Sequence, residues 1–129
     1  IKFKPMTRSR PKNLNLTTIR LPLPALISVL HRISGTLLFL AIPALLWLWQ
    51  LSLASTEGYT TALQLLHHSI AKLALLLLIW AYLHHACAGL RHLAMDAHWG
   101  LKLSFARASS AGVLFISGLL TLYAGVWLW

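Results

Sequence analysis

The sequence predicts an all-α membrane protein that crosses a bilayer with three transmembrane helices. Of its 129 residues 58% are hydrophobic and only 10% are charged, whereas about 25% of the residues in an ordinary soluble domain are charged. Three apolar windows cover residues 35–53, 69–90 and 108–129. At about 1.5 Å of rise per residue, each window is long enough to span a hydrocarbon core about 30 Å thick. Residues 73–82 (LALLLLIWAY) lack the polar face that a helix of a soluble core would show.

The charges are few and strongly basic. Eleven Lys and Arg residues face only two acidic residues, Glu57 and Asp96. The cations flank the apolar windows and do not gather into the single basic face that phosphate contacts require, which argues against nucleic-acid binding. Because three helices alone enclose little interior, we expect this chain to pack against a partner.

The first element expected is a basic arm, residues 1–24, which holds four prolines and reads as extended chain on the cytoplasmic face. No cleavage motif follows the first apolar run, so the arm is not expected to be a signal peptide. The chain begins at Ile1 and not at Met, which leaves the true start open. The remaining residues, 25–129, form the transmembrane domain, with helices expected at about 25–54, 69–95 and 106–129.

The cations also predict orientation. Most of them precede the first window or lie between the second and third, and the positive-inside rule places both regions in the cytoplasm or matrix. The C-terminus then lies on the opposite side of the membrane, which in a bacterium is the periplasm. Tryptophans support this placement, because they cluster at the predicted outer ends of the first and third helices, where indole rings prefer the interface; these are Trp47, Trp49, Trp127 and Trp129.

Two polar faces enter the membrane from the cytoplasmic side. The first helix carries polar or small residues at spacing i, i+3, i+4, i+7, which lie on one helical face; these are Ser28, His31, Arg32 and Gly35. The second helix carries another such face at i, i+4, i+7, i+11, made of His85, Gly89, His92 and Asp96. Ionisable groups within a membrane are costly and mark functional sites. We therefore expect the two faces to converge on one ligand.

Each polar residue also has a structural interpretation. Arg32, Arg91 and Lys102 could extend to the inner interface and only set topology. Ser28 could bond a carbonyl of its own helix. Asp96 could pair with Arg91 or His92. Three further histidines are expected to be solvated: His67, His68 and His98.

His84 and His85 differ from these, because neither lies near a helix end. Neutral imidazole is a common axial ligand of haem. Of the two residues His85 is favoured, since Gly89 one turn later removes side-chain bulk where a flat macrocycle would approach. The single cysteine, Cys87, permits neither an intrachain disulfide nor a cysteine-ligated cluster and is expected to be an apolar filler.

These residues resemble the cytochrome b556 subunits of succinate dehydrogenase, the membrane anchors of respiratory complex II, in their bacterial form. Residues 85–96 (HACAGLRHLAMD) match that family's H-x3-G-x-R-H-x3-D signature, and residues 28–35 (SVLHRISG) match its S-x2-H-R-x-S-G motif. Arg10-Pro11 matches the family's Arg-Pro opening, whereas Lys12 departs from it. The likeness covers nearly the whole chain.

The resemblance implies a membrane anchor that passes electrons from an iron–sulfur subunit to ubiquinone. A second small hydrophobic subunit would complete the helical bundle, and a flavoprotein subunit would oxidise succinate, so no catalysis is expected of the isolated chain. His85 would be one axial ligand of a b-type haem and the partner anchor would supply the other. Ser28 would hydrogen-bond the quinone and Arg32 would stabilise its negative charge or approach a haem propionate. His31, Arg91 and His92 would be propionate or supporting groups, in a protein of the bacterial inner membrane.

Two other functions remain open from the sequence. One is a haem-free, quinone-reactive anchor of the fumarate reductase type, in which His85 would be structural. The other is a non-redox membrane protein, such as an assembly factor or small transporter, with the two polar faces lining a pocket.

Overall fold

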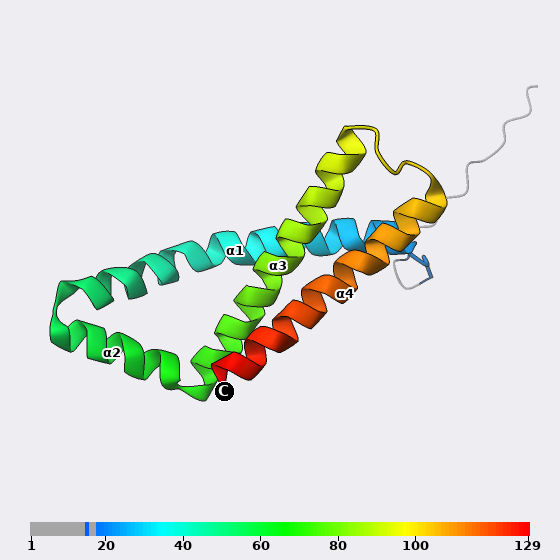
Figure 1. The fold of residues 1–129 in the computed structure, drawn as a ribbon. Coiled ribbons are helices and arrows are strands. Elements are labelled where there is room, and N and C mark those ends of the chain that lie inside the picture. The colour runs from blue at the N-terminus through cyan, green and yellow to red at the C-terminus, as the bar shows by residue number, and fades with distance from the viewer. Residues whose placement is uncertain (1–14, 16–17) are drawn as a thin grey trace, which may run out of the picture.

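The structure, a computed structural model, describes residue 15 and residues 18–129, and these form four helices (Figure 1). They are α1 (Leu23–Ala54), α2 (Thr56–His67), α3 (Ser69–Asp96) and α4 (Leu103–Leu128). Helices α1, α3 and α4 are long and apolar enough to cross a membrane, which confirms the three predicted spans. The Arg10-Pro11 motif, Lys12 and most of the predicted basic arm lie outside the described residues.

The helix ends follow from local chemistry. Helix α1 begins at Leu23, two residues before the predicted position, with Pro22 as its N-cap and Pro24 in its first turn. Proline suits these positions because the first amide groups of a helix have no partner within it. Helix α4 begins at Leu103, after a short loop in which His98 adopts a positive φ of 62°.

Helix α2 was not predicted, because none of the three helices expected from the sequence covers its residues. Ser55 caps it, because the Ser55 hydroxyl accepts a hydrogen bond of 2.9 Å from the amide of Gly58. Its side facing α1 carries Tyr59, Ala62 and Leu63, at helical spacing. His67 and His68 end the helix and are exposed, as expected.

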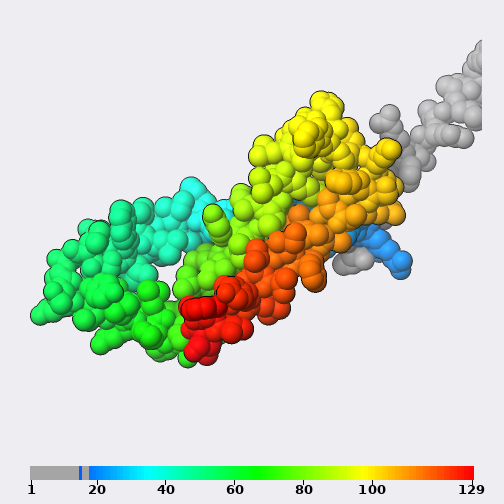
Figure 2. All heavy atoms as spheres, viewed as in Figure 1, coloured from blue at the N-terminus to red at the C-terminus, as the bar shows by residue number. Residues whose placement is uncertain are grey.

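Helix α3 packs against both α1 and α4 (Figure 1). Helix α1 crosses α3 and then diverges from it, and α2 returns from the C-terminal end of α1 to the start of α3. Helices α3 and α4 pack against each other and diverge toward the loop that joins them, whereas the C-terminal part of α1 extends away from them with α2 (Figure 1 and Figure 2). The crossing of α1 and α3 is therefore the close contact between these two spans.

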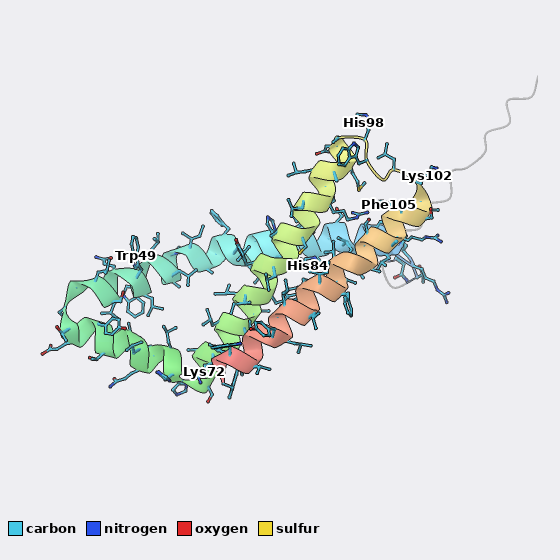
Figure 3. The ribbon with its side chains drawn as sticks, in the orientation of Figure 1. Trp49, Lys72, His84, His98, Lys102 and Phe105 are labelled. Atoms are coloured by element: carbon cyan, nitrogen blue, oxygen red, sulfur yellow. The ribbon has the colours of Figure 1, made fainter. Side chains whose placement is uncertain are left out.

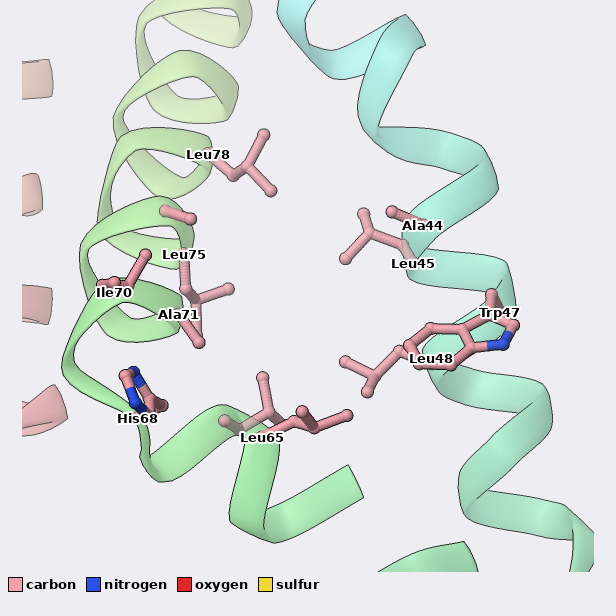
Figure 4. Close-up of a pocket in the computed structure, with 12 residues that line it drawn as sticks. Ala44, Leu45, Trp47, Leu48, Leu65, His68, Ile70, Ala71, Leu75 and Leu78 are labelled. Carbon is pink, nitrogen blue, oxygen red and sulfur yellow. The ribbon is translucent and has the colours of Figure 1, made fainter. Parts of the chain in front are cut away.

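A wedge-shaped cavity of about 500 Å³ lies between the diverging parts of α1, α2 and α3 (Figure 4). Its lining is apolar apart from His68; the labelled lining residues are Ala44, Leu45, Trp47, Leu48, Leu65, His68, Ile70, Ala71, Leu75 and Leu78. Such a lining offers almost nothing to hydrogen-bond a polar group. The predicted polar site residues lie elsewhere, near the crossing of α1 and α3.

Small residues line the contact between α3 and α4. Ala81 and Ala88 of α3 are fully buried, as are Ser110 and Ser117 of α4. Small side chains let transmembrane backbones approach closely. Both serine hydroxyls donate to carbonyls of their own helix, at 2.7 Å, so they are satisfied without water.

Large apolar side chains cover the outside of the helices. Phe39, Leu122 and Val126 are 71%, 71% and 78% exposed. In water such a surface would drive aggregation, whereas lipid or another subunit accepts it. The exposed surface agrees with a multi-pass membrane protein.

Candidate functional site

The structure brings the two predicted polar faces together where α1 crosses α3. The rings of His31 and His85 stack, with centroids 4.1 Å apart and planes 12° from parallel. The ring of His92 meets that of His31 edge-on, at 5.1 Å and 60°. Three of the predicted site residues therefore form one cluster of rings, which we call the histidine cluster.

The hydrogen bonds of His85 determine which ring nitrogen carries a proton. Nδ1 of His85 lies 3.0 Å from the backbone oxygen of His31. A carbonyl oxygen can only accept, so Nδ1 must be the donor. In the neutral imidazole Nε2 is then left with a free lone pair, which is the form a metal ligand requires.

Ser34 takes part in the same arrangement. Its hydroxyl donates to the oxygen of His31 at 2.9 Å and lies 3.3 Å from Nδ1 of His85. Ser34 is fully buried, so water does not compete for these contacts. Sequence reasoning passed over this residue, although it stands in the 28–35 motif and three residues after His31, the spacing at which a serine reaches a carbonyl of the preceding turn.

Gly35 makes the crossing close enough for these contacts, whereas Gly89 does not have to be a glycine for them to form. A Cβ placed on Gly35 would lie 2.8 Å from Cε1 and 3.2 Å from Nδ1 of His85. Any side chain there would push the ring away, which explains glycine at this position. A Cβ on Gly89 would lie 3.6 Å from Nε2 of His31, an ordinary contact. The space beside Gly89, expected to admit a macrocycle, is thus occupied by the ring of His31.

Ser28 and Arg32 lie on α1 beside the histidine cluster but not inside it. Ser28 is half-buried and Arg32 is exposed. They stand one turn apart on the helix, so one molecule approaching this side of α1 could contact both. The structure thus separates a ring cluster at the crossing from a more open polar surface next to it.

Arg91 points away from the histidine cluster, toward α4. Its Nε donates to the hydroxyl of Ser109 at 3.0 Å and its Nη2 to the carbonyl of Ala106 at 3.3 Å. Only 8% of the residue is exposed, so it does not extend to the interface as one interpretation required. Neither is Asp96 its hydrogen-bond partner; Asp96 is exposed at the end of α3.

His84, the alternative candidate, faces a different environment from His85. Figure 3 labels His84 on α3. The residue is fully buried and stacks on Trp80, with ring centroids 5.4 Å apart. Neither of its ring nitrogens has a hydrogen-bond partner. It shares the buried side of α3 with Ala81, Ala88 and Arg91, the residue that bonds to α4. His84 therefore belongs to the α3–α4 contact.

The residues present fit a haem at His85. The proton on Nδ1 leaves Nε2 free, the acceptor is a fixed backbone carbonyl, and Gly35 leaves the ring the space it needs. His84 offers nitrogens that nothing orients, and Cys87 is a lone, half-buried thiol. Of these three candidate ligands on α3, His85 alone has the supporting contact that metal-binding histidines use.

Comparisons with known proteins agree with the motifs. The family model described as succinate dehydrogenase/fumarate reductase transmembrane subunit matches residues 6–124. The chain is 40% identical over 125 residues to the succinate dehydrogenase cytochrome b556 subunit of Coxiella burnetii, covering 96% of this chain and 100% of the relative. It is 31% identical to the corresponding subunit of Rickettsia felis, with 88% of each chain covered, and 32% identical to that of Paracoccus denitrificans, with 82% of each covered.

Proposed function

The chain belongs to the succinate dehydrogenase/fumarate reductase transmembrane subunit family, and on this premise we propose that it is the haem b-binding, quinone-binding anchor of a succinate dehydrogenase. The names of its relatives support a b-type cytochrome within such a complex. The observation that carries the proposal is the contact between Nδ1 of His85 and the carbonyl of His31.

In this proposal Nε2 of His85 would hold the haem iron, and a second hydrophobic subunit would supply the other protein ligand. A bound haem would supply one-electron chemistry. The task of this chain is to hold the imidazole still and in the correct tautomer. The His31 carbonyl, the stacked His31 ring and the missing side chain of Gly35 do so from α1.

The basic groups near the crossing would receive the haem propionates. His31 and His92 stand within the histidine cluster, and Arg32 is exposed beside it. Arg91 already uses Nε and one N–H of Nη2 on α4, so it could contribute only through Nη1 and the second N–H of Nη2. Its main contribution is to fix α3 against α4, and thereby the direction in which α3 presents His85.

Ser28 and Arg32 would bind the quinone head. The Ser28 hydroxyl can donate to a carbonyl oxygen of the quinone. The Arg32 guanidinium provides a fixed positive charge where negative charge develops during reduction, and such a charge acts strongly in a low-dielectric setting. Both residues lie near the start of α1, at the end that the positive-inside rule places in the cytoplasm.

The remaining subunits follow from what this chain lacks. Its single cysteine cannot hold an iron–sulfur cluster, and in this proposal electrons would come from an iron–sulfur subunit, with succinate oxidised on a flavoprotein subunit. Both would dock on the cytoplasmic side of the bacterial inner membrane, next to the Ser28 and Arg32 surface.

The decisive test is a reduced-minus-oxidised visible spectrum of the detergent-extracted complex from wild type, His85→Ala and His84→Ala. We expect a b-type band in wild type and in His84→Ala, and its loss or shift in His85→Ala. An unchanged band in His85→Ala would remove His85 as the ligand.

The quinone role has a separate test. Ser28→Ala and Arg32→Leu should lower the reduction of ubiquinone by succinate and leave the reduction of an artificial acceptor by the flavoprotein unchanged. Equal ubiquinone reduction in wild type and both variants would contradict the assignment.

The haem-free anchor is the second candidate, because the description of the family covers fumarate reductase as well. It predicts a complex with quinone activity and no haem band in wild type. That single spectrum decides between the two functions.

A further inference from the structure

Ser34 is a buried residue at the crossing to which the proposed function gives no task. We propose that Ser34 is a positioning residue: its hydroxyl, together with the His31 carbonyl, fixes the ring orientation of His85. The inference rests on the proposed function, since it concerns how the haem ligand is held.

A hydrogen bond within α1 fixes the position of the Ser34 hydroxyl oxygen. Ser34 Oγ donates to the carbonyl of His31 at 2.9 Å, and this bond fixes the rotamer of the serine. With its proton directed to that carbonyl, Oγ offers its lone pairs elsewhere. The Oγ atom lies 3.3 Å from Nδ1 of His85, on the neighbouring helix.

Nδ1 of His85 therefore has two acceptor oxygens on α1 within reach. Nδ1 lies 3.0 Å from the His31 carbonyl oxygen and 3.3 Å from the Ser34 hydroxyl oxygen. A single acceptor leaves a ring free to tilt about one hydrogen bond, whereas a second acceptor restricts that tilt. The ring of His31, stacked 12° from parallel, supports one face of the imidazole.

Ser117 is a buried serine of the same chain with which Ser34 can be compared. Ser117 is equally buried and also donates to a carbonyl of its own helix, Val113 at 2.7 Å. Such bonds are ordinary for serine in helices. Ser34 differs because its oxygen also lies within reach of a ring nitrogen on another helix. Ser117→Ala is therefore a matched control, which removes a buried hydroxyl without touching His85.

The test compares wild type, Ser34→Ala, Ser34→Thr and Ser117→Ala in the intact complex. The first readout is the low-spin ferric electron paramagnetic resonance signal, whose g-values depend on the orientation of the axial imidazole. The second is the rate at which haem is lost to an apoprotein acceptor. Removing a group that supports a metal ligand costs about 10- to 100-fold in affinity. Because the His31 carbonyl remains, we expect the lower end, about tenfold faster haem loss in Ser34→Ala.

Ser34→Thr keeps the hydroxyl, and threonine in a helix readily bonds the carbonyl three or four residues back. We therefore expect Ser34→Thr to retain the wild-type g-values and Ser117→Ala to match wild type in both readouts. A shifted signal in Ser34→Ala alone supports the inference.

Ser34→Ala with unchanged g-values and unchanged haem loss would overturn the inference, as would equal shifts in Ser34→Ala and Ser117→Ala. Failure of the proposed function looks different, since wild type itself would then show no haem signal or His85→Ala would keep it.

Discussion

Gly35→Ala tests whether close approach at the crossing is what holds His85. The added Cβ would lie 2.8 Å from Cε1 of His85, whereas ordinary contact begins at 3.4 Å. The two atoms must therefore move apart by about 0.6 Å. The ring stands against the backbone of α1 and stacks on His31, so either the ring or the helix pair must move. Overpacking of this kind costs about 1–3 kcal/mol.

If the ring takes up the whole displacement, this cost appears in haem binding. At about 1.4 kcal/mol for each tenfold change, haem affinity should fall roughly 5- to 150-fold. The assay is haem content per protein together with a haem titration of the depleted complex. If the helices separate instead, the thermal midpoint of the complex should fall while the spectrum keeps its shape.

Gly112→Ala is the control, because a Cβ at Gly112 on α4 would meet no atom within 4 Å. Both changes make the same chemical substitution in a transmembrane helix, so the difference between them isolates the contact with His85. If Gly35→Ala matched Gly112→Ala in haem affinity, spectrum and thermal midpoint, the reasoning from close approach would be refuted.

Three further predictions follow from the structure. Arg91→Lys should lose one of the two hydrogen bonds to α4 and destabilise the complex by about 1.5–3 kcal/mol. The control Arg107→Lys, at an exposed position, should change the thermal midpoint little. Equal thermal midpoints of the two variants would contradict the role of Arg91. His84→Phe should retain the haem band and leave stability unchanged or higher, because both nitrogens that it removes are buried without partners; a lost band would make His84 a ligand. In a background without the native cysteine, Gln64→Cys should react with an impermeant thiol reagent in intact cells and His98→Cys only after permeabilisation; the reverse pattern would invert the orientation.

The three spans could be predicted because lipid constrains composition directly: a spanning helix must be apolar over about 20 residues. Helix α2 was missed because its 12 residues are too few and too polar to resemble a span. The capping residue Ser55 and the apolar spacing of Tyr59, Ala62 and Leu63 were signals that could have found it.

The polar faces were also readable from the sequence, because the residues of one helical face recur at fixed spacing. The same rule could have placed Arg91 on a different face of α3 from His85. Arg91 follows His85 by six residues, which at 100° per residue puts it about 120° around the helix. The partnership of Ser34 and His85 could not be predicted, since it depends on the register in which α1 crosses α3.

That register has a consequence for how the complex is made. The proposed ligand His85 belongs to α3, whereas the His31 carbonyl and the Ser34 hydroxyl that contact its ring belong to α1. A chain whose first two spans have inserted separately holds an imidazole of undefined tautomer and direction. If His85 holds the haem as proposed, only the docked helix pair can bind it, and haem binding during biogenesis then depends on helix association. Mutations that loosen the crossing should therefore appear first as apoprotein in the membrane, before any loss of insertion.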